Sequence, residues 1–423
     1  MLATICLTLL AATNAPPTIT TAITDTTIEV GDGSVIEHGT VVFAGNVIVA
    51  VGNTVAVPAG AVVVDGRGKV TSPGFVAVDS QVGLVAIGME TGLGDSSTTG
   101  NVRAAFRAAD GFNPLAVSVP VDREEGVTSA VLSPSGNTLI NGQGCVVELR
   151  TSLAARPDPD APAAMFGRYD GHVAAAFGGS RSALALALRS LIDDTRLYQR
   201  QRAAFDRGEL RALSVEMHQL QAFIPVVEGK LPLVMRADRA TDILALLDVA
   251  AREKLKLMIV GGAESWLVAD RLKAAKVPVV LVPSASGSIS FDALHARDDL
   301  AAVLVAAGVE IVITSWASDN GTTRLRQEAG IAVQNGLSRA AAIAAIAAGP
   351  AALFSVRHDD KLVGKLVAGG RANVVLWSGD PLEVLSIAEQ LWVAGEAQTT
   401  PSRQRQLAEK YRPLVAGQPA TAP

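Results

Sequence analysis

The chain has 423 residues, of which 49% are hydrophobic and 18% are charged. This length can bury a large core or two domains, and the composition is typical of an ordered globular protein. The net charge is −5, and the sequence has no run of Lys or Arg and no alternation of aromatic with basic residues. These features argue against nucleic-acid binding, which needs a basic face.

The first segment, residues 1–15, holds an apolar run from Leu2 to Ala12 followed by small residues up to Ala15. The run is too short to cross a bilayer and is typical of a secretory signal peptide, although it lacks a preceding Lys or Arg. The alternative is a misassigned start or a buried apolar arm. We expect cleavage near Ala15, a periplasmic or secreted protein, and no membrane span. Cys145 would then stand alone, so no intrachain disulfide is expected.

Residues 16–72 are rich in β-branched residues broken by Gly-containing turns, which predicts an all-β segment. In residues 73–350, short apolar runs alternate with longer helical patterns, which favours a TIM-type (β/α)8 barrel of parallel units and the α/β class. Within this block, residues 160–228 read as a helical, polar insertion. The predicted strands are 75–78, 127–132, 231–235, 257–260, 277–282 and 309–313, and the predicted helices are 240–254, 265–275, 291–307 and 324–336.

After the barrel block, residues 351–400 return to β-strand patterns, and residues 401–423 predict a short polar helix with a disordered end. Neither terminal β block holds enough strands to close its own core. We therefore predict a composite β-sandwich, built jointly from residues 16–72 and 351–400, beside the barrel.

One motif begins at Pro73 and reads as a turn, a short apolar strand and a polar pair, Asp79 and Gln81. It resembles a segment of the amidohydrolase superfamily, Pro-Gly-apolar-apolar-Asp-apolar-His-x-His, which ends the first barrel strand. Residues 340–354 and 364–375 are similar to later segments of the same superfamily, in its imidazolonepropionase-like and dihydroorotase-like branch. The resemblance extends over nearly the whole chain after residue 15.

The resemblance implies a zinc site at the carboxyl ends of the barrel strands, but the expected ligands are replaced. Asp79 and Gln81 stand in place of two histidines, Arg236 and Gly261 each stand in place of another, and Trp316 stands at the catalytic aspartate. Asp319 could serve as that aspartate only if the loop is realigned by three residues. No bridging lysine is evident at the fourth strand.

These replacements remove the chemistry that zinc requires. Zinc needs three or four nitrogen, sulfur or oxygen donors, and Gly261 and Trp316 supply none. Arg236 adds a fixed positive charge that opposes a cation. We therefore predict no metal cofactor. The five histidines, His38, His172, His218, His295 and His358, lack metal-ligand spacing to one another.

Two strand-to-helix loops carry further candidates. Arg236 and Asp238 lie in a charged loop, which is either part of the functional rim or the start of a capped helix. The loop from Gly261 to Glu264 either seats an anion at a helix N-terminus or is simply a tight turn. The sequence leaves both choices open.

Three functions remain at this point. The first is an exported, metal-free pseudoenzyme that binds a small ligand or a paralogous amidohydrolase subunit, in a homo- or hetero-oligomer. The second is a metal-dependent hydrolase of non-peptide carbon–nitrogen bonds, such as those of cyclic amides or dipeptide-like compounds, with Asp79, Asp319 and Glu264 as unconventional ligands. The third is a structural protein of the cell envelope. The first is the function that we predict.

Overall fold

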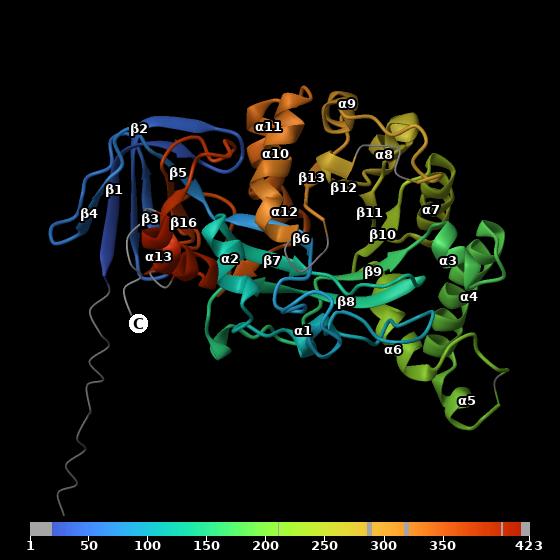
Figure 1. Cartoon of the computed structure of the whole chain (residues 1–423). Helices are drawn as coiled ribbons and strands as arrows, with labels where there is room; N and C mark the ends of the chain where they lie inside the picture. Colours follow the sequence, from blue (N-terminus) through green and yellow to red (C-terminus); the bar gives the residue numbers. More distant parts are fainter. Residues whose placement is uncertain (1–18, 210, 286–289, 317–320, 399–400, 416–423) are drawn as a thin grey trace, which may run out of the picture.

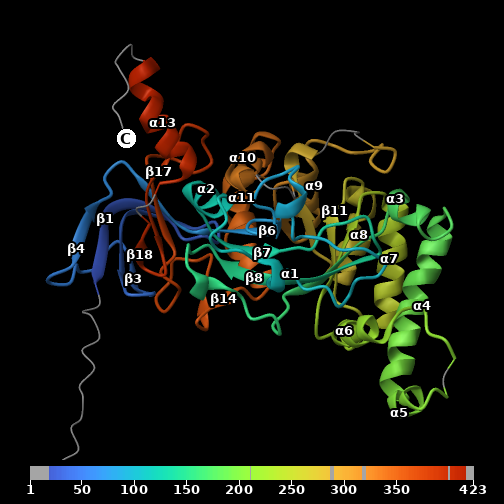
Figure 2. The same cartoon turned by 60° about the horizontal axis from the view of Figure 1, so that its bottom comes forward.

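The computed structural model describes residues 19–209, 211–285, 290–316, 321–398 and 401–415, so the predicted signal segment and Asp319 lie outside the described residues. Within these residues the strands form two eight-stranded sheets and one two-stranded sheet. Figures 1 and 2 show one large sheet at one side of the molecule and the other, surrounded by helices, beside it. No helix of the described residues is long and apolar enough to span a membrane.

The first sheet combines both ends of the chain in the order β18-β17-β16-β5-β1-β2-β3, with β4 also pairing β1. Its strands are β1 Thr20–Glu29, β2 Val35–Ala44, β3 Val47–Gly52, β4 Val62–Asp65, β5 Val70–Pro73, β16 Val374–Trp377, β17 Ala388–Val393 and β18 Glu396–Ala397. The antiparallel pairing of β5 with β16 joins the N-terminal and C-terminal parts. The sheet thus joins strands from both ends of the chain, whereas the composite β-sandwich domain stays a prediction.

The second sheet, the barrel sheet, has the order β13-β12-β11-β10-β9-β8-β7-β6. Its strands are β6 Phe75–Ser80, β7 Val127–Leu132, β8 Ile140–Glu148, β9 Ala164–Arg168, β10 Leu233–Ala237, β11 Leu257–Gly261, β12 Val279–Leu281 and β13 Ile311–Ile313. The Thr314 hydroxyl, directly after β13, donates a hydrogen bond to the Val78 carbonyl in β6, so the sheet is nearly closed. This arrangement is consistent with the predicted TIM-type barrel.

Two strands of the barrel sheet differ from the sequence prediction. β8 was not predicted, and it runs antiparallel to both β7 and β9, so not every unit is parallel. β9 lies in the stretch predicted to be a helical insertion. The sequence hides β8 because the strand contains two glycines and an asparagine, which are poor strand formers. In the sheet, Gly144 of β8 allows the backbone of β7 and the Phe166 ring of β9 to approach closely.

Helices cover the outside of the barrel sheet (Figure 2). They are α1 Ala108–Gly111, α2 Ser118–Glu124, α3 Gly171–Ala175, α4 Arg181–Arg200, α5 Arg202–Asp206, α6 Met217–Val227, α7 Ala240–Glu253, α8 Ala269–Ala275, α9 Leu300–Ala307, α10 Leu325–Gln334, α11 Arg339–Ile346 and α12 Ala348–Leu353, and α13 Arg403–Val415 follows the first sheet. The helix predicted over 291–307 is present only as α9. The others predicted in this block begin and end within a few residues of α7, α8 and α10, and 265–268 is a 3-10 turn.

The two large sheets meet where β5 passes into β6 with a single residue, Gly74, between them. A Cβ on Gly74 would lie 2.0 Å from the Thr128 hydroxyl oxygen, so only glycine fits this crossing. Phe75 of β6 stacks on Trp377 of β16 with ring centroids 5.7 Å apart. Buried apolar side chains on β6 and β10–β13 then form the barrel core, as expected for strands covered on both faces.

Candidate functional site

A cavity of about 400 Å³ opens at the end of the barrel sheet where the parallel strands finish. Side chains at or just after the ends of β6, β9, β10, β11 and β12 line it, together with the β7–β8 connection. Of the predicted site residues, those that line it are Asp79, Gln81, Arg236, Asp238, Gly261 and Trp316. Six residues that the sequence places at or near strand ends therefore line the same cavity.

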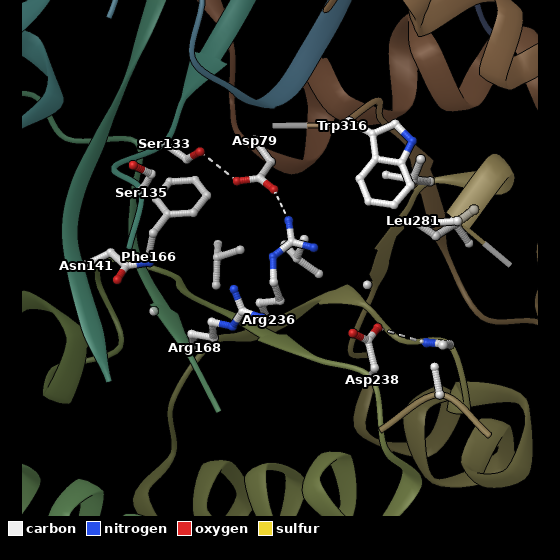
Figure 3. A pocket seen from close by; sticks show the side chains of 18 of the residues that line it. Asp79, Ser133, Ser135, Asn141, Phe166, Arg168, Arg236, Asp238, Leu281 and Trp316 are labelled. Carbon is white, nitrogen blue, oxygen red and sulfur yellow. Dashed lines mark hydrogen bonds and ion pairs between the residues drawn. The ribbon is translucent and has the colours of Figure 1, made fainter. Parts of the chain in front are cut away.

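Asp79 lines the cavity and is held by two partners. Its Oδ1 accepts a hydrogen bond of 2.6 Å from the Ser133 hydroxyl, and its Oδ2 accepts one from Nη2 of Arg236, as Figure 3 shows. The backbone at Asp79 has a φ of 54°, in the left-handed region that few residues other than Gly, Asn and Asp adopt. Both carboxylate oxygens are thus engaged within the protein.

Arg168 lies beside Arg236 in the cavity (Figure 3). The two residues are direct partners in the parallel pairing of β9 with β10. Arg168 forms an ion pair with Asp170 and donates a hydrogen bond of 3.0 Å to the Asn137 side chain. Asp170 also accepts from the Val173 amide at the start of α3, so it is fixed by a second contact.

The Asp238 side chain occupies the space that a side chain at position 261 would need. A Cβ on Gly261 would lie 2.4 Å from Oδ1 of Asp238, and Gly261 has a φ of 89°. Asp238 accepts a hydrogen bond of 3.3 Å from the Ala263 amide, and burial raises the pKa of its carboxyl group despite the nearby Arg236. A side chain at position 261, such as the histidine of the superfamily pattern, has no room unless Asp238 moves.

Glu264 does not line the cavity. Its buried carboxylate accepts hydrogen bonds from the Ala240 amide at the start of α7 and from the backbone and ring of His295. These bonds hold the pKa of Glu264 below its ordinary value against the effect of burial. The geometry therefore gives Glu264 the role of joining two loops, and the tight-turn reading of this loop fits better than an anion seat.

Trp316 follows β13 and is 43% exposed at the cavity wall. Its indole nitrogen donates to the Ser284 hydroxyl at 3.2 Å, and Ser284 is itself bonded to the buried Glu328. The indole is thus oriented by a chain of contacts from α10. Asp319, the remaining predicted residue, lies outside the described residues.

Several lining residues were missed by sequence reasoning. They are Ser133, Asn141, Phe166 and Arg168, which come from β8, β9 and the β7–β8 connection. For Arg168 a signal existed: residues 164–170 form a short apolar run that ends in charged residues, like 233–238. For the β7–β8 connection no comparable signal exists, because a reversed strand is not expected in a barrel of parallel units.

The described residues do not fit the zinc ion that the superfamily resemblance implies. Zinc needs three or four converging donors, whereas Asp79 is committed to Ser133 and Arg236, and Gly261 has no side chain. The Arg236 guanidinium would repel a cation. Among the residues that the structure describes, no group of three or more His, Cys, Asp or Glu side chains is arranged to hold a metal.

Comparisons with known proteins agree on the fold. No family model matches the chain. A curated relative, amidohydrolase tasK of Hapsidospora irregularis, is 23% identical over 374 residues, which cover 81% of this chain and 38% of that protein. The chain thus spans less than half the length of this relative.

Comparison with solved structures identifies the fold. An amidohydrolase from Thermotoga maritima MSB8 matches with a TM-score of 0.79 and 23% identity, covering 89% of this chain and 99% of that one. This chain has the amidohydrolase fold. The fold that the sequence resemblance implies is thereby confirmed.

Further structures with the amidohydrolase fold are more distant. Molinate hydrolase matches with a TM-score of 0.56 and 15% identity, over 97% of this chain and 99% of that one. An adenosine deaminase from Xanthomonas campestris with bound zinc matches with 0.54 and 15%, over 95% and 100% of the two chains. At these identities the likeness concerns the fold alone.

Proposed function

We propose that this protein is a metal-free member of the amidohydrolase fold that binds a small ligand in the barrel cavity. The observation that carries the proposal is the Arg236–Asp79 ion pair, which joins β10 to β6 at the strand ends where the superfamily pattern implies a metal. A guanidinium group there supplies a positive charge without a coordination site. A cavity of about 400 Å³ lined by both polar and apolar groups suits a small organic molecule.

The runner-up function is a metal-dependent hydrolase of non-peptide carbon–nitrogen bonds, which the names of the relatives favour. Its three proposed ligands are Asp79, Glu264 and Asp319. The first two have their carboxylates committed to other groups of the protein. The contacts therefore favour the metal-free proposal.

Elemental analysis of the purified protein, with a screen for amide and carbamate hydrolysis, tests the choice. We expect less than one zinc ion per ten chains and no hydrolysis that a chelator abolishes. One zinc ion per chain, or chelator-sensitive turnover, would establish the hydrolase instead.

A second measurement uses Asp79→Ala. In the proposed protein the change leaves metal content unchanged but removes the partner of Arg236, and we expect unfolding to become easier by about 1–3 kcal/mol, since Arg236 stays partly exposed. In a metalloenzyme the same change would lower the metal content. Metal content and thermal melting of the variant and the natural protein therefore separate the two functions.

The proposal includes export, on the strength of the apolar run from Leu2 to Ala12. It also includes a second use of the cavity face, as the contact with a paralogous subunit in a homo- or hetero-oligomer. N-terminal sequencing of the protein recovered from the periplasm checks the first point, and light scattering checks the second.

A further inference from the structure

We propose that the cavity ligand is a small organic anion, whose carboxylate or phosphate group binds between Arg168 and Arg236 and whose apolar part lies against Phe166, Leu281 and Trp316. This inference rests on the proposed function and specifies its ligand class. Nothing in the superfamily resemblance assigns either arginine to ligand binding.

The first argument is the register of the two strands. Arg168 and Arg236 are direct partners in the β9–β10 pairing, and partners on adjacent strands present their side chains to the same face. Both residues line the cavity, and Figure 3 labels both among its lining side chains. Each arginine already pairs with one carboxylate, Arg236 with Asp79 and Arg168 with Asp170. An anion between the two strands could accept further hydrogen bonds from both guanidinium groups.

The second argument is the number of donors that remain. An arginine has five N–H donors in a planar fork. Within the described residues, Arg236 donates to Asp79, and Arg168 donates to Asp170 and Asn137. Each guanidinium therefore keeps N–H groups beyond these bonds, and each side chain is about 30% exposed. Such a fork matches the two oxygens of a carboxylate or phosphate.

The third argument is that the acidic side chains of the cavity are either hydrogen-bonded within the protein or exposed to solvent. Both oxygens of Asp79 are hydrogen-bonded, and Oδ1 of the half-buried Asp238 accepts a hydrogen bond from the Ala263 amide. Asp298 lines the cavity too, but it is exposed to solvent. Among the described lining residues, Arg168 and Arg236 are thus the charged groups with hydrogen-bond donors left over.

The fourth argument is the apolar wall, which distinguishes this site from one for inorganic phosphate. Phe166, Val234, Val260, Leu281 and Trp316 line the same cavity. Ligand sites of this size commonly combine such walls with a few polar groups that fix orientation. Gln81, buried at the cavity lining, adds an amide that can donate or accept.

The test compares three probes of similar shape by isothermal titration: benzoate, phenyl phosphate and neutral benzamide. We expect at least one of the two anions to bind about tenfold or more tightly than benzamide, as charge-assisted hydrogen bonds to arginine predict. Arg168→Met should weaken anion binding about tenfold and leave benzamide binding unchanged. Arg271→Met, which removes a surface partner of Asp248, is the matched control and should change neither.

Folding of the variants is checked by thermal melting, and Arg168→Lys serves if Arg168→Met does not fold. Lysine keeps the charge but not the fork, so we expect partial loss of anion binding. Equal binding of anions and benzamide, no binding of either anion, or full anion binding by the folded Arg168 variant would each overturn the inference. The metal-free proposal would survive these results, because zinc content and chelator-sensitive hydrolysis decide it.

Discussion

At the scale of single residues, the charged side chains in and around the site form ion pairs or hydrogen bonds with one another. Asp79 and Arg236 neutralise each other, Arg168 pairs with Asp170, and Glu264 links two loops. A different residue, Asp122 on α2, is buried with neither side-chain oxygen bonded within the described residues. Burial, aided by the nearby Glu125, raises the pKa of Asp122 well above its ordinary value.

Asp122 gives the first prediction, on pH and stability. Because its pKa is higher in the folded than in the unfolded protein, its protonated form stabilises the fold at low pH. That stability is lost as the pH rises above about 4 towards the folded pKa. Asp122→Asn cannot ionise, so we expect the variant to be as stable as the natural protein at pH 4 and more stable by about 1–3 kcal/mol at pH 7.

Thermal melting of both proteins between pH 4 and pH 8 measures this effect. Asp248→Asn, which removes a carboxylate from a surface ion pair with Arg271, is the control and should change stability by less than about 1 kcal/mol. A difference between Asp122→Asn and the natural protein that stays constant over this range would contradict the assignment.

At the scale of elements, the reversed strand β8 shapes the cavity. Because β8 runs against its neighbours, the β7–β8 connection, with Ser133 and Ser135, lies at the carboxyl end of β7 and lines the cavity. Gly144 in β8 lies between β7 and β9: a Cβ there would be 2.3 Å from the Leu132 carbonyl oxygen and 2.4 Å from the Phe166 ring. The glycines that make β8 hard to predict from the sequence thus allow it to pack between β7 and β9.

Gly144→Ala is the prediction for this element. We expect it to destabilise the protein by about 1–3 kcal/mol, because the added methyl group displaces a backbone carbonyl or the Phe166 ring. Since Phe166 also lines the cavity, probe binding should weaken as well. Gly92→Ala, where the new methyl group would meet no atom within 4 Å, is the control for melting and titration. Equal melting of both variants would show that β8 can shift at no cost.

The strand ends show how much of the site the sequence could predict. Asp79, Arg236, Gly261 and Trp316 were found because each follows an apolar run of recognisable form. Arg168 escaped because β9 was included in a polar, helical stretch. Sequence patterns identify a side chain at a strand end, but the partner of that side chain depends on strand order and register, which long-range pairing decides.

At the scale of the whole molecule, a buried ion pair connects the two large sheets. Arg371, just before β16, donates two hydrogen bonds of 2.9 and 2.6 Å to Glu148 at the end of β8. Asn373 also donates to Glu148, and Arg371 reaches Asp359. Both members of the main pair are almost fully buried, so removal of one leaves an uncompensated charge.

Arg371→Met should therefore cost about 3–5 kcal/mol of stability. The double variant Glu148→Gln, Arg371→Met should lose less than the sum of the two single variants, because the charge left behind is removed as well. Chemical denaturation of the four proteins measures the coupling. Additive losses would mean that the pair does not act as a unit.

The sequence predicted the general order of this architecture, namely β-rich ends around a β/α block. It did not predict the contacts between them, because Arg371 and Glu148 are 223 positions apart and carry no mutual signal. The Phe75–Trp377 stack joins residues that lie even farther apart in the sequence. Such contacts depend on the complete fold.

The pairing of β5 with β16 has a consequence for protein synthesis. Roughly 300 residues separate these strands, so at usual translation rates β5 emerges from the ribosome about 15–60 s before its partner. During that interval β5 has an unpaired edge of the kind that recruits strands from other nascent chains. The last part of the chain to be translated therefore protects the first from aggregation, and premature termination would release a product that lacks this protection.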